Sequence, residues 1–244
     1  MSISDDLRHS YSLFENDWLE QLRNKMNDEE KADAFENSYV RIASIQSWKS
    51  IIETIYSSTC VVYIVEAQND LLSSLILARL GSWRVSLKSL RSSMENTAKF
   101  IYYKDHPVEQ KQSEDGTYRF SFSQFLKYIE AYPYEKQPPN VIKVVDNLSR
   151  EYSVLSKAVH ASNARFQMSS HGPLPQMWVT SISDQSQWIS RERMVINSIN
   201  CLLLVMHFDL IEGTKYPEQR SVISNAISSG LHSEILTAYA VRLS

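Results

Sequence analysis

The sequence predicts an all-α fold, organised as a single-domain bundle of long helices. The chain has 244 residues but only five glycines and seven prolines, and long stretches without these residues favour long helices over many short strands. Apolar residues recur at spacings of three and four along most of these stretches, which is the period of one helix face. A hydrophobic content of 43% is ordinary for a globular protein and sufficient for a sizeable core.

Four helices are predicted in the first half of the chain. Residues 3–27 carry an apolar stripe at helical spacing, and Asp28 can cap a second helix that ends near residue 56. Residues 60–80 begin with a β-branched run, but no turn signal interrupts them, so we expect a helix rather than a strand. Gly81-Ser82 is expected to form either a C-cap followed by a new helix or a tight bend in one long helix, and the helical stretch after it ends ahead of Pro107.

The second half of the chain alternates polar segments with helices. Residues 108–117 are polar and predict a loop, and prolines and glycines mark the later breaks. No repeat, low-complexity segment or long linker suggests a second domain. The remaining elements are predicted as a short helix at 119–131, a helix at 140–161, an irregular segment at 162–184, and closing helices at 185–212 and 217–242.

Net charge and hydropathy narrow the functional classes. A net charge of −3 argues against a general nucleic-acid coat or a membrane-surface protein, although it leaves room for a local basic patch. The first residues lack the basic start and apolar run of a signal peptide. Residues 194–211 form the most apolar segment, but polar residues interrupt it, which favours a buried helix over a membrane span. We therefore expect a cytoplasmic protein without membrane contact.

The cysteine content predicts core thiols rather than a metal site. Cys60 and Cys201 both lie in apolar helical stretches, where reduced, buried thiols are expected. Two cysteines without nearby paired histidines do not make a usual zinc site. The sequence also lacks a glycine-rich phosphate loop and the familiar hydrolase motifs. We therefore expect neither a metal ion nor a cofactor.

A charged stripe follows one side of the helix that contains residues 84–99, RVSLKSLRSSMENTAK. An ordinary solvated face explains it, with ion pairs four residues apart that contribute about 0.2–0.5 kcal/mol each. The stripe is also suited to form one wall of a site. Arg91 and Glu95 are then the candidate site residues, while Arg84 and Lys88 are expected to be ordinary surface charges. The members of the stripe are Arg84, Lys88, Arg91, Glu95 and Lys99.

A second polar ladder lies in the helix predicted at 140–161. Ser156 and His160 lie one turn apart at the edge of its buried stripe, and Tyr152, a member of that stripe, lies one turn before Ser156. Partly desolvated polar groups in such a position must find hydrogen-bond partners. His160 is either a structural histidine near a helix C-terminus, where a cation is favoured, or a general acid and base, because the pKa of histidine lies near neutrality.

A third candidate pair lies in the irregular segment. Arg165 and His171 have five residues between them, and a regular helix would place their side chains about 120° apart. They can converge only through an irregular backbone, which the neighbouring Gly172-Pro173 allows. Arg150 and His160, by contrast, are about 15 Å apart along one helix and cannot meet on a single phosphate.

Two of these segments resemble a known family. Residues 78–103 are similar to a helix pattern with a small residue, then Leu-Arg-x-x-x-Glu, then an aromatic-rich end, and residues 150–162 are similar to a Tyr-x-x-Leu-Ser-x-x-Val-His pattern. In this order they resemble domains of unknown function from bacterial defence and abortive-infection loci, which look like relatives of the all-α HEPN (higher eukaryote and prokaryote nucleotide-binding) superfamily. The resemblance covers about 60–215, between N-terminal helices at 1–59 and a C-terminal helix at 216–244.

The resemblance implies a helical bundle that dimerises. In active HEPN members an arginine and a histidine, separated by four to six residues, meet their symmetry mates and cleave RNA without a metal. The two motifs assign Arg91 with Glu95, and Ser156 with His160. The usual arginine-to-histidine spacing is found only at Arg165 and His171, where Phe166 replaces the polar residue that usually follows the arginine.

Two functions are therefore expected from the sequence. The first is an HEPN-like effector of a bacterial antiviral system, acting as a metal-independent ribonuclease on RNA or nucleotides. In this function His160 is the general acid and base, Arg91 with Lys99 stabilises the charge on the phosphorane, Glu95 orients Arg91 or His160, and Ser156 holds the imidazole.

The second is a non-catalytic helical binding or adaptor module, or the inhibitory partner in a defence complex, because a fold alone does not determine function. In this function Arg91, Glu95 and His160 form a buried polar network that fixes the register of the helices. The expected partners are RNA or a nucleotide, and a second copy or another protein of a defence operon. An open cleft beside the network favours the enzyme, whereas its absence favours the module.

Overall fold

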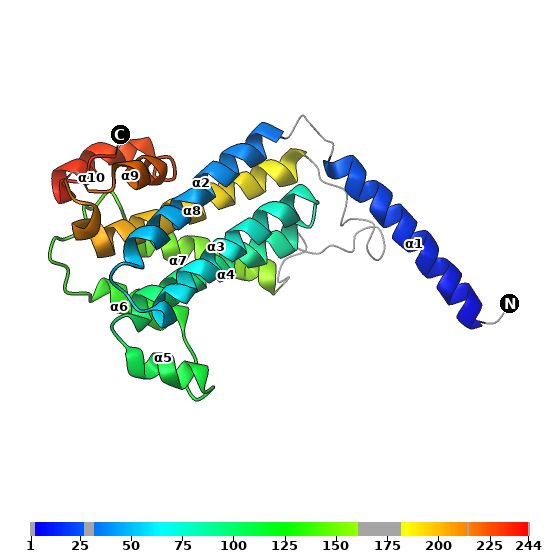
Figure 1. The fold of residues 1–244 in the computed structure, drawn as a ribbon, viewed down its shortest axis with the longest axis horizontal. Helices are drawn as coiled ribbons and strands as arrows, with labels where there is room; N and C mark the ends of the chain where they lie inside the picture. Colours follow the sequence, from blue (N-terminus) through cyan, green and yellow to red (C-terminus); the bar gives the residue numbers. More distant parts are fainter. Residues whose placement is uncertain (1–2, 27–31, 161–181, 214, 244) are drawn as a thin grey trace.

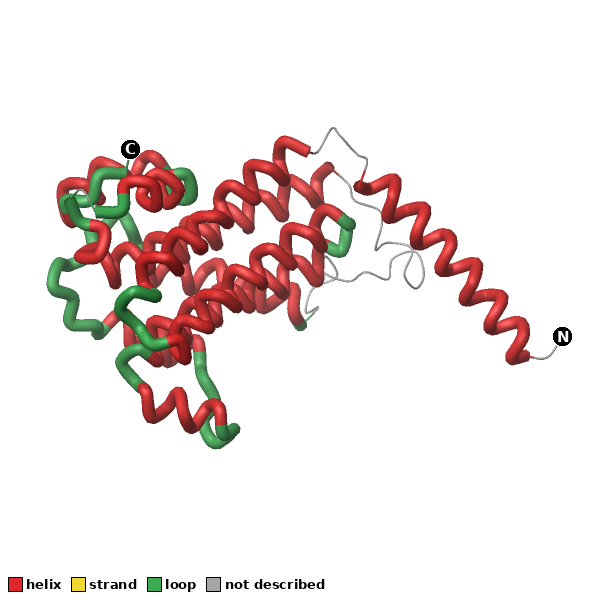
Figure 2. The backbone as a smooth tube through the Cα atoms, in the orientation of Figure 1, coloured by secondary structure: helices red, strands yellow, loops and turns green. Residues whose placement is uncertain are grey.

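The computed structural model describes residues 3–26, 32–160, 182–213 and 215–243. Every regular element in these ranges is a helix, as the tube in Figure 2 shows. The predicted all-α class is therefore confirmed. In chain order the elements are α1 (Ile3–Met26), α2 (Ala32–Ile52), α3 (Ser58–Arg79), α4 (Trp83–Tyr103), α5 (Pro107–Glu114), α6 (Phe122–Glu130), α7 (Val144–Val159), α8 (Ile182–Ile211), α9 (Pro217–Ser224), a 3₁₀ turn η4 (Ser229–Leu231) and α10 (His232–Tyr239).

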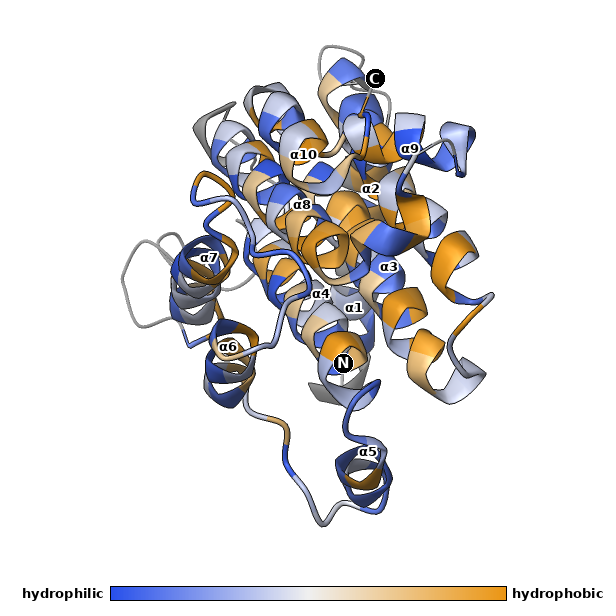
Figure 3. Ribbon diagram, turned by 90° about the vertical axis from the view of Figure 1, so that its left-hand side faces the viewer, coloured by the Kyte–Doolittle hydropathy of each residue, from blue (hydrophilic) through white to orange (hydrophobic). Residues whose placement is uncertain are grey.

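Five long helices form the body of the molecule (Figure 1). Helix α8 packs against α2, α4 and α7, while α3 packs against both α2 and α4. In Figure 3 the hydrophobic residues concentrate around α8 and toward α2 and α3. One continuous hydrophobic core results, which extends from Phe35 in α2 to Leu243 near the C-terminus.

Helix α8 is enclosed on nearly all sides in its C-terminal third. Residues 201–208 are all buried, so the buried helix predicted at 194–211 is confirmed. At His207 the backbone leaves helical geometry, with φ −142° and ψ 25°. The Nδ1 atom of this buried imidazole lies 3.3 Å from the hydroxyl of Tyr56, which ties the kink to the end of the segment after α2.

Two helices are long and apolar enough to cross a membrane by length and composition alone. In Ser58–Arg79, 33% of the apolar window is buried within the protein, and in Gln185–Ile211, 72% is buried. High burial is what the core helix of a globular protein shows, so α8 is accounted for by the bundle itself. The cytoplasmic location without membrane contact stays a prediction.

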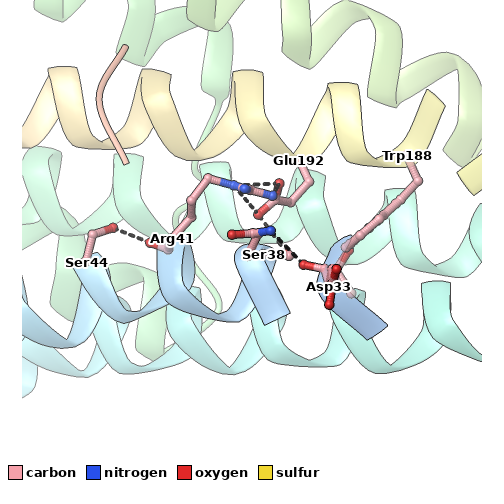
Figure 4. A network of polar contacts seen from close by, with 8 residues as sticks. Asp33, Ser38, Arg41, Ser44, Trp188 and Glu192 are labelled. Atoms are coloured by element: carbon pink, nitrogen blue, oxygen red, sulfur yellow. Dashed lines mark hydrogen bonds and ion pairs between the residues drawn. The ribbon is translucent and has the colours of Figure 1, made fainter. Parts of the chain in front are cut away.

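A buried polar network joins α2 to α8 (Figure 4). Nη2 of Arg41 lies 2.6 Å from Oε2 of the fully buried Glu192, and the hydroxyl of Ser38 donates to Oε1 at 2.8 Å. Burial raises the pKa of Glu192, and the Arg41 guanidinium counteracts that rise. Two turns along, Nε1 of Trp48 donates to Oδ1 of Asn200 at 2.9 Å. These bonds satisfy groups that both helices bury and so fix their register.

The connection between α3 and α4 is a tight helix C-cap. Gly81 has φ 82°, its amide donates to the carbonyl of Ala78 at 3.0 Å, and the amide of Ser82 donates to the carbonyl of Leu77 at 2.8 Å. This is the Schellman arrangement, which requires a left-handed residue that glycine adopts without strain. Of the two alternatives predicted at Gly81-Ser82, the C-cap followed by a new helix is confirmed, and α4 begins at Trp83.

The loop predicted at 108–117 is wrong for most of its length, because α5 occupies Pro107–Glu114. Pro107 was interpreted only as a stop for the preceding helix. A proline at the first helical position also favours a new helix, since its φ suits that position and its missing amide proton is not needed there. Gln110 anchors α5 to the body, because its buried side chain donates to the carbonyl of Thr59 at 2.8 Å.

The single closing helix predicted at 217–242 is also wrong. Helix α9 ends at Ser224, a 3₁₀ turn covers Ser229–Leu231, and α10 follows. The break has a partner in the bundle, because the amide of Ser228 donates to Oδ1 of Asn197 in α8 at 2.8 Å. A side-chain acceptor on another helix thus replaces the intrahelical bond that a continuous helix would have made.

The helix predicted at 140–161 is shorter at its start. Lys143 adopts φ 43° and ψ 47°, so α7 begins only at Val144. A left-handed residue cannot continue a right-handed helix, and its position after Pro138 and Pro139 separates α7 from the preceding segment. The remaining part, Val144–Val159, carries the predicted Tyr152 and Ser156.

Helix α1 and the two cysteines are found as the sequence predicts. Helix α1, predicted at 3–27, is found at Ile3–Met26 and extends away from the bundle in Figure 1. Cys60 and Cys201 are both buried and free, as expected. Burial raises the pKa of Cys60 to about 11 and that of Cys201 to about 12, so both thiols are protonated and unreactive at neutral pH.

Candidate functional site

Arg91 and Glu95 of α4 meet Tyr152 of α7 in one hydrogen-bonded triad. Nη2 of Arg91 donates to the Tyr152 hydroxyl at 2.7 Å, and the same hydroxyl donates to Oε1 of Glu95 at 2.7 Å. Nη2 of Arg91 also lies 2.9 Å from that Glu95 oxygen. The two polar ladders predicted from the sequence therefore face each other, through Tyr152 rather than through His160.

The electrostatics of the triad follow from partial burial. Burial opposes the charged form of Arg91, but the hydrogen bond to Tyr152 and the charge of Glu95 outweigh it, so the pKa of Arg91 is raised. Burial and the hydrogen bond to Glu95 raise the pKa of Tyr152, and Arg91 offsets part of that rise. The phenol is therefore neutral near pH 7 and acts as a hydrogen-bond bridge between the cation and the carboxylate.

Helices α4 and α7 run in opposite directions where they pack. Nε of Arg84, near the start of α4, donates to the carbonyl of Ala158, near the end of α7, at 3.2 Å. Arg91, two turns further along α4, meets Tyr152 instead. The interpretation of Arg84 as mere surface charge is therefore wrong, since it satisfies one of the carbonyls that a helix C-terminus leaves free. Lys88 is exposed, as expected.

His160 lies apart from this triad. It is the exposed residue at the C-terminal cap of α7, about 12 Å along the helix axis from Tyr152. The hydroxyl of Ser156 donates to the carbonyl of Tyr152 within the same helix, at 2.7 Å, rather than holding the imidazole. The expected network of Arg91, Glu95 and His160 is therefore wrong, because Arg91 and Glu95 contact Tyr152, and two turns of α7 separate Tyr152 from His160. Arg165 and His171 lie outside the described residues.

A pocket of about 700 Å³ opens beside the triad. Arg91, Glu95 and Lys99 line it from α4, and Tyr152 lines it from α7. The remaining lining comes from residues 118–123, which lead into α6, and from Ser113 of α5. Helices α4, α6 and α7 contact one another pairwise, and Figure 3 shows α6 and α7 at the left of the view beside α4. We call this site the basic pocket.

The basic pocket has an excess of positive charge. Its lining contains the cations Arg91, Lys99 and Arg119 and one carboxylate, Glu95. Among the described residues, Nζ of Lys99 has a long contact of 3.4 Å to Oδ1 of Asn96, lies 5.9 Å from the centre of the Tyr63 ring, and interacts electrostatically with the carboxylate of Asp70, without an ion pair. Arg119 is exposed and makes no ion pair with another described residue. Two of the three cations are therefore available to an anionic ligand.

Aromatic packing holds the wall of the pocket in place. The ring of Tyr152 stacks on Phe122 of α6, with centroids 3.9 Å apart and planes 7° apart. The guanidinium carbon of Arg91 lies 4.7 Å from the centre of the Tyr152 ring. Tyr152 thus connects α4, α6 and α7 at one point, and its hydroxyl is presented at a fixed position.

The sequence predicts the α4 wall of this pocket but not the wall made by residues 118–123. The helix predicted at 119–131 in fact begins at Phe122, so the residues before it belong to a loop. A signal was present in the alternation of hydroxyl and aromatic residues, Arg-Phe-Ser-Phe-Ser at 119–123. Such a segment can present polar groups to one side while its phenylalanines pack on the other.

Comparisons with protein-family models, with curated proteins and with solved structures find no match for this chain.

Proposed function

We propose that this protein binds RNA or a nucleotide in the basic pocket and serves as an HEPN-like effector of a bacterial antiviral system, of the abortive-infection or toxin type. The observation that carries the proposal is the convergence of Arg91, Lys99 and Arg119 on one pocket of about 700 Å³. A pocket of this size accepts a ligand of nucleotide dimensions. The HEPN-like motifs supply the class of ligand, and the operon partner or second copy that they imply belongs to the same proposal.

Phosphate recognition suits the chemistry of the pocket. Arginine, lysine and serine side chains, together with backbone amides at a helix start, make most contacts to nucleic-acid phosphates. The basic pocket offers each of these groups, since Ser121 and Ser123 flank the first residue of α6. Phe120 and Tyr118 add aromatic surface at the same pocket, against which a base can pack.

Metal-independent RNA cleavage is part of the proposal, with a changed division of roles. In the basic pocket Glu95 is placed to accept the proton of a ribose 2′-hydroxyl, while Arg91 stabilises the charge on phosphorus. The bond from O2′ to phosphorus then forms as the bond to O5′ breaks, and solvent protonates the leaving oxygen. His160, about 12 Å along α7 from Tyr152, is not needed for this step.

Binding is tested by fluorescence anisotropy with a labelled single-stranded RNA and the full-length protein. We expect Arg119→Ala to weaken binding about tenfold, the order expected for loss of a charge-assisted hydrogen bond. The matched control is Lys127→Ala, which removes an exposed cation from α6 outside the pocket lining. If both variants lose the same affinity for RNA, or if neither loses any, binding at the basic pocket is contradicted.

Cleavage is tested separately by following RNA integrity in cells that express wild type, Glu95→Gln or His160→Ala. We expect Glu95→Gln to protect cellular RNA and His160→Ala to leave cleavage unchanged. Intact RNA with wild type, combined with normal binding in vitro, favours the alternative function of a non-catalytic binding or adaptor module. The triad supports that alternative independently, because it ties α4 to α7 and would fix helix register without any reaction.

A further inference from the structure

We infer that the outward face of α3 pairs with the same face of a second copy of this chain, as two parallel helices in register. The inference goes beyond the proposed function, because it needs neither RNA binding nor cleavage. It rests on the apolar character of that face, on the spacing of its side chains, and on exposed apolar residues beside it on α2 and α4.

Helix α3 is apolar on the side that the bundle leaves uncovered. Its inward side contributes Ile64 and Leu71 to the core, yet only 33% of its most apolar window is buried within the protein. On the outward side Val62 is 45% exposed and Ile76 is 58% exposed. A surface helix is ordinarily apolar on its core side alone, so a second apolar side indicates a further packing partner.

The outward face follows the heptad spacing of a two-stranded coiled coil. Val62, Asn69 and Ile76 are seven residues apart, and Val65 and Leu72 each lie three residues after one of them. We call these five residues the α3 stripe. In parallel two-stranded coiled coils the first position of this pattern favours β-branched residues, the second favours leucine, and one asparagine at the first position fixes the register. The α3 stripe meets all three preferences, with Val65 as a shorter residue at one leucine position.

Asn69 marks the level at which the two copies meet. It is exposed, and its amide nitrogen lies a long 3.5 Å from Oε1 of Glu66. In an in-register pair the amide of one copy can donate to the amide oxygen of the other, which satisfies both where the apolar residues around them exclude water. Glu66 does not oppose this pairing, because its two copies lie on opposite sides of a parallel pair.

Tyr39 of α2 extends the apolar surface on one side of the α3 stripe. The ring of Phe35, near the start of α2, lies 5.9 Å from the guanidinium carbon of Arg79, the last residue of α3. Tyr39 is one turn further along α2 and is exposed, and Ile76 is three residues before Arg79. The two exposed side chains therefore lie at the same level of the bundle.

Val85 of α4 extends the surface on the other side at that level. The hydroxyl of the next residue, Ser86, lies 2.8 Å from that of Ser74 in α3, two residues before Ile76, and Val85 itself is exposed. A two-fold axis along the α3 stripe places the α2 side of one copy opposite the α4 side of the other. Tyr39 of each copy then faces the Val85 side chain of the other, so the surface is complementary to itself.

The size of this surface predicts a reversible dimer. The α3 stripe is about 21 Å long, and α2, α3 and α4 are separated by two helix spacings of about 8–10 Å each. The resulting area of roughly 350–400 Å² per copy belongs to the class of weak, reversible complexes. A lipid bilayer is a poorer occupant, because Glu66, Asn69 and Asp70 lie near the middle of α3, where burial in lipid is costly.

A dimer through α3 leaves the basic pocket open. In Figure 3 α4 lies between α3 and the pair of α6 and α7, and the pocket is lined from α4, α7 and residues 118–123 of one copy. The dimer therefore carries two separate pockets, each complete within its own chain. The HEPN resemblance implies instead that residues of two copies meet in one site.

Sedimentation velocity of the full-length protein between about 1 and 100 μM tests the association. We expect a monomer–dimer equilibrium that depends on concentration. Ile76→Lys is expected to raise the dissociation constant at least about tenfold, because it places two ammonium groups against each other. Val108→Lys, at an exposed valine of α5, is the matched control and is expected to leave the dimer unchanged. Circular dichroism verifies that both variants fold.

Cysteine cross-linking tests the orientation of the two helices. Cys60 and Cys201 are buried, so introduced thiols report on the interface. We expect Val62→Cys and Ile76→Cys each to form a disulfide-linked dimer under mild oxidation, and Val108→Cys to remain monomeric. An antiparallel pair over the same stripe would hold the two thiols of either variant about 21 Å apart, so that only a mixture of the two variants would cross-link.

Each other outcome overturns the inference. A protein that is monomeric at every concentration has no such interface, and a dimer that Ile76→Lys leaves intact, or that Val108→Lys weakens equally, uses another surface. Cross-linking only in the mixture of Val62→Cys and Ile76→Cys excludes the parallel pair. A monomer that co-sediments with vesicles of phosphatidylcholine and phosphatidylglycerol, and loses this binding in Ile76→Lys, assigns the face to a membrane. RNA binding at the basic pocket is measured independently of all these results.

Discussion

The phenol of Tyr152 in α7 donates a hydrogen bond of 2.7 Å to the carboxylate of Glu95 in α4 while it accepts one of the same length from Arg91. One hydroxyl therefore satisfies a cation and an anion on the neighbouring helix. The ring beneath it stacks on Phe122 of α6. The position of this single side chain determines how α4, α6 and α7 meet at the basic pocket.

Removing that hydroxyl tests the bridge without disturbing the stacking. Tyr152→Phe keeps the ring against Phe122 but leaves Arg91 and Glu95 with only each other. We expect the free energy of unfolding to fall by about 1 kcal/mol, the usual contribution of such a bond. Urea denaturation measures the change. Tyr39→Phe, at an exposed tyrosine of α2, is the control, and an equal effect in both variants would contradict a specific role for the bridge.

The pair between Arg41 and Glu192 is expected to contribute far more than a surface pair of the same length. Glu192→Gln removes the anion that pairs with Arg41, whose side chain is only 12% exposed. Loss of one partner from a buried pair costs about 3–5 kcal/mol. Glu53→Gln breaks the pair with Lys49, also 2.6 Å long but exposed, at a cost of about 0.2–1 kcal/mol. Chemical denaturation of the two variants should therefore give clearly different midpoints; similar midpoints would show that the buried network is not stabilising.

The buried His207 predicts a loss of stability in mild acid. Burial, with a smaller contribution from Lys104, lowers the pKa of His207 to about 3 from its usual 6.5. The unfolded chain then binds more protons than the folded one below pH 6.5, so the stability associated with the neutral imidazole is present above that pH and is lost as the pH falls toward 3.

Between pH 7 and pH 5 this linkage amounts to about 2 kcal/mol. We expect His207→Gln to remove that part of the pH dependence in unfolding titrations, with the exposed His9→Gln as the control. A pH profile unchanged by His207→Gln would mean that other groups are responsible for the acid sensitivity.

Arg84 and Lys88 lie on the same stripe but should respond differently to truncation. Arg84→Ala removes the donor to the carbonyl of Ala158 near the end of α7, and a charge-assisted bond at a helix C-terminus contributes about 1–2 kcal/mol. Lys88→Ala, at an exposed position, is expected to change stability by less than about 0.5 kcal/mol. Thermal unfolding of both proteins measures the difference, and a larger effect at Lys88 would rule out the cap.

Much of the fold was predictable because long helices carry a strong periodic signal. The same period that identified α4 also placed Arg91, Glu95 and Lys99 on one face, and the structure brings all three to one pocket. Tyr152 belongs to the buried stripe predicted for this helix and is found half-buried against α4. These successes concern residues within helices, where spacing alone determines direction.

The errors concern positions where helices begin or end. His160 belongs to the predicted ladder by spacing, but α7 ends one residue earlier, so the histidine is exposed at the cap. Pro107 was predicted only to end the preceding helix. It is also the first residue of α5. Arg119 lies in the segment before α6, which the sequence predicted as the first turn of a helix, and helical spacing could not place it at one pocket with Lys99.

The separation of α2 from α8 along the chain has a consequence for folding. Arg41 and Ser38 contact Glu192, about 150 positions later, whereas α3 and α4 form a local hairpin closed at Gly81. During synthesis, at roughly 5–20 residues per second, the ribosome releases α2 many seconds before its carboxylate partner exists. The α3–α4 hairpin can therefore form early, as local contacts do, while α2 must wait for the C-terminal half to neutralise Arg41.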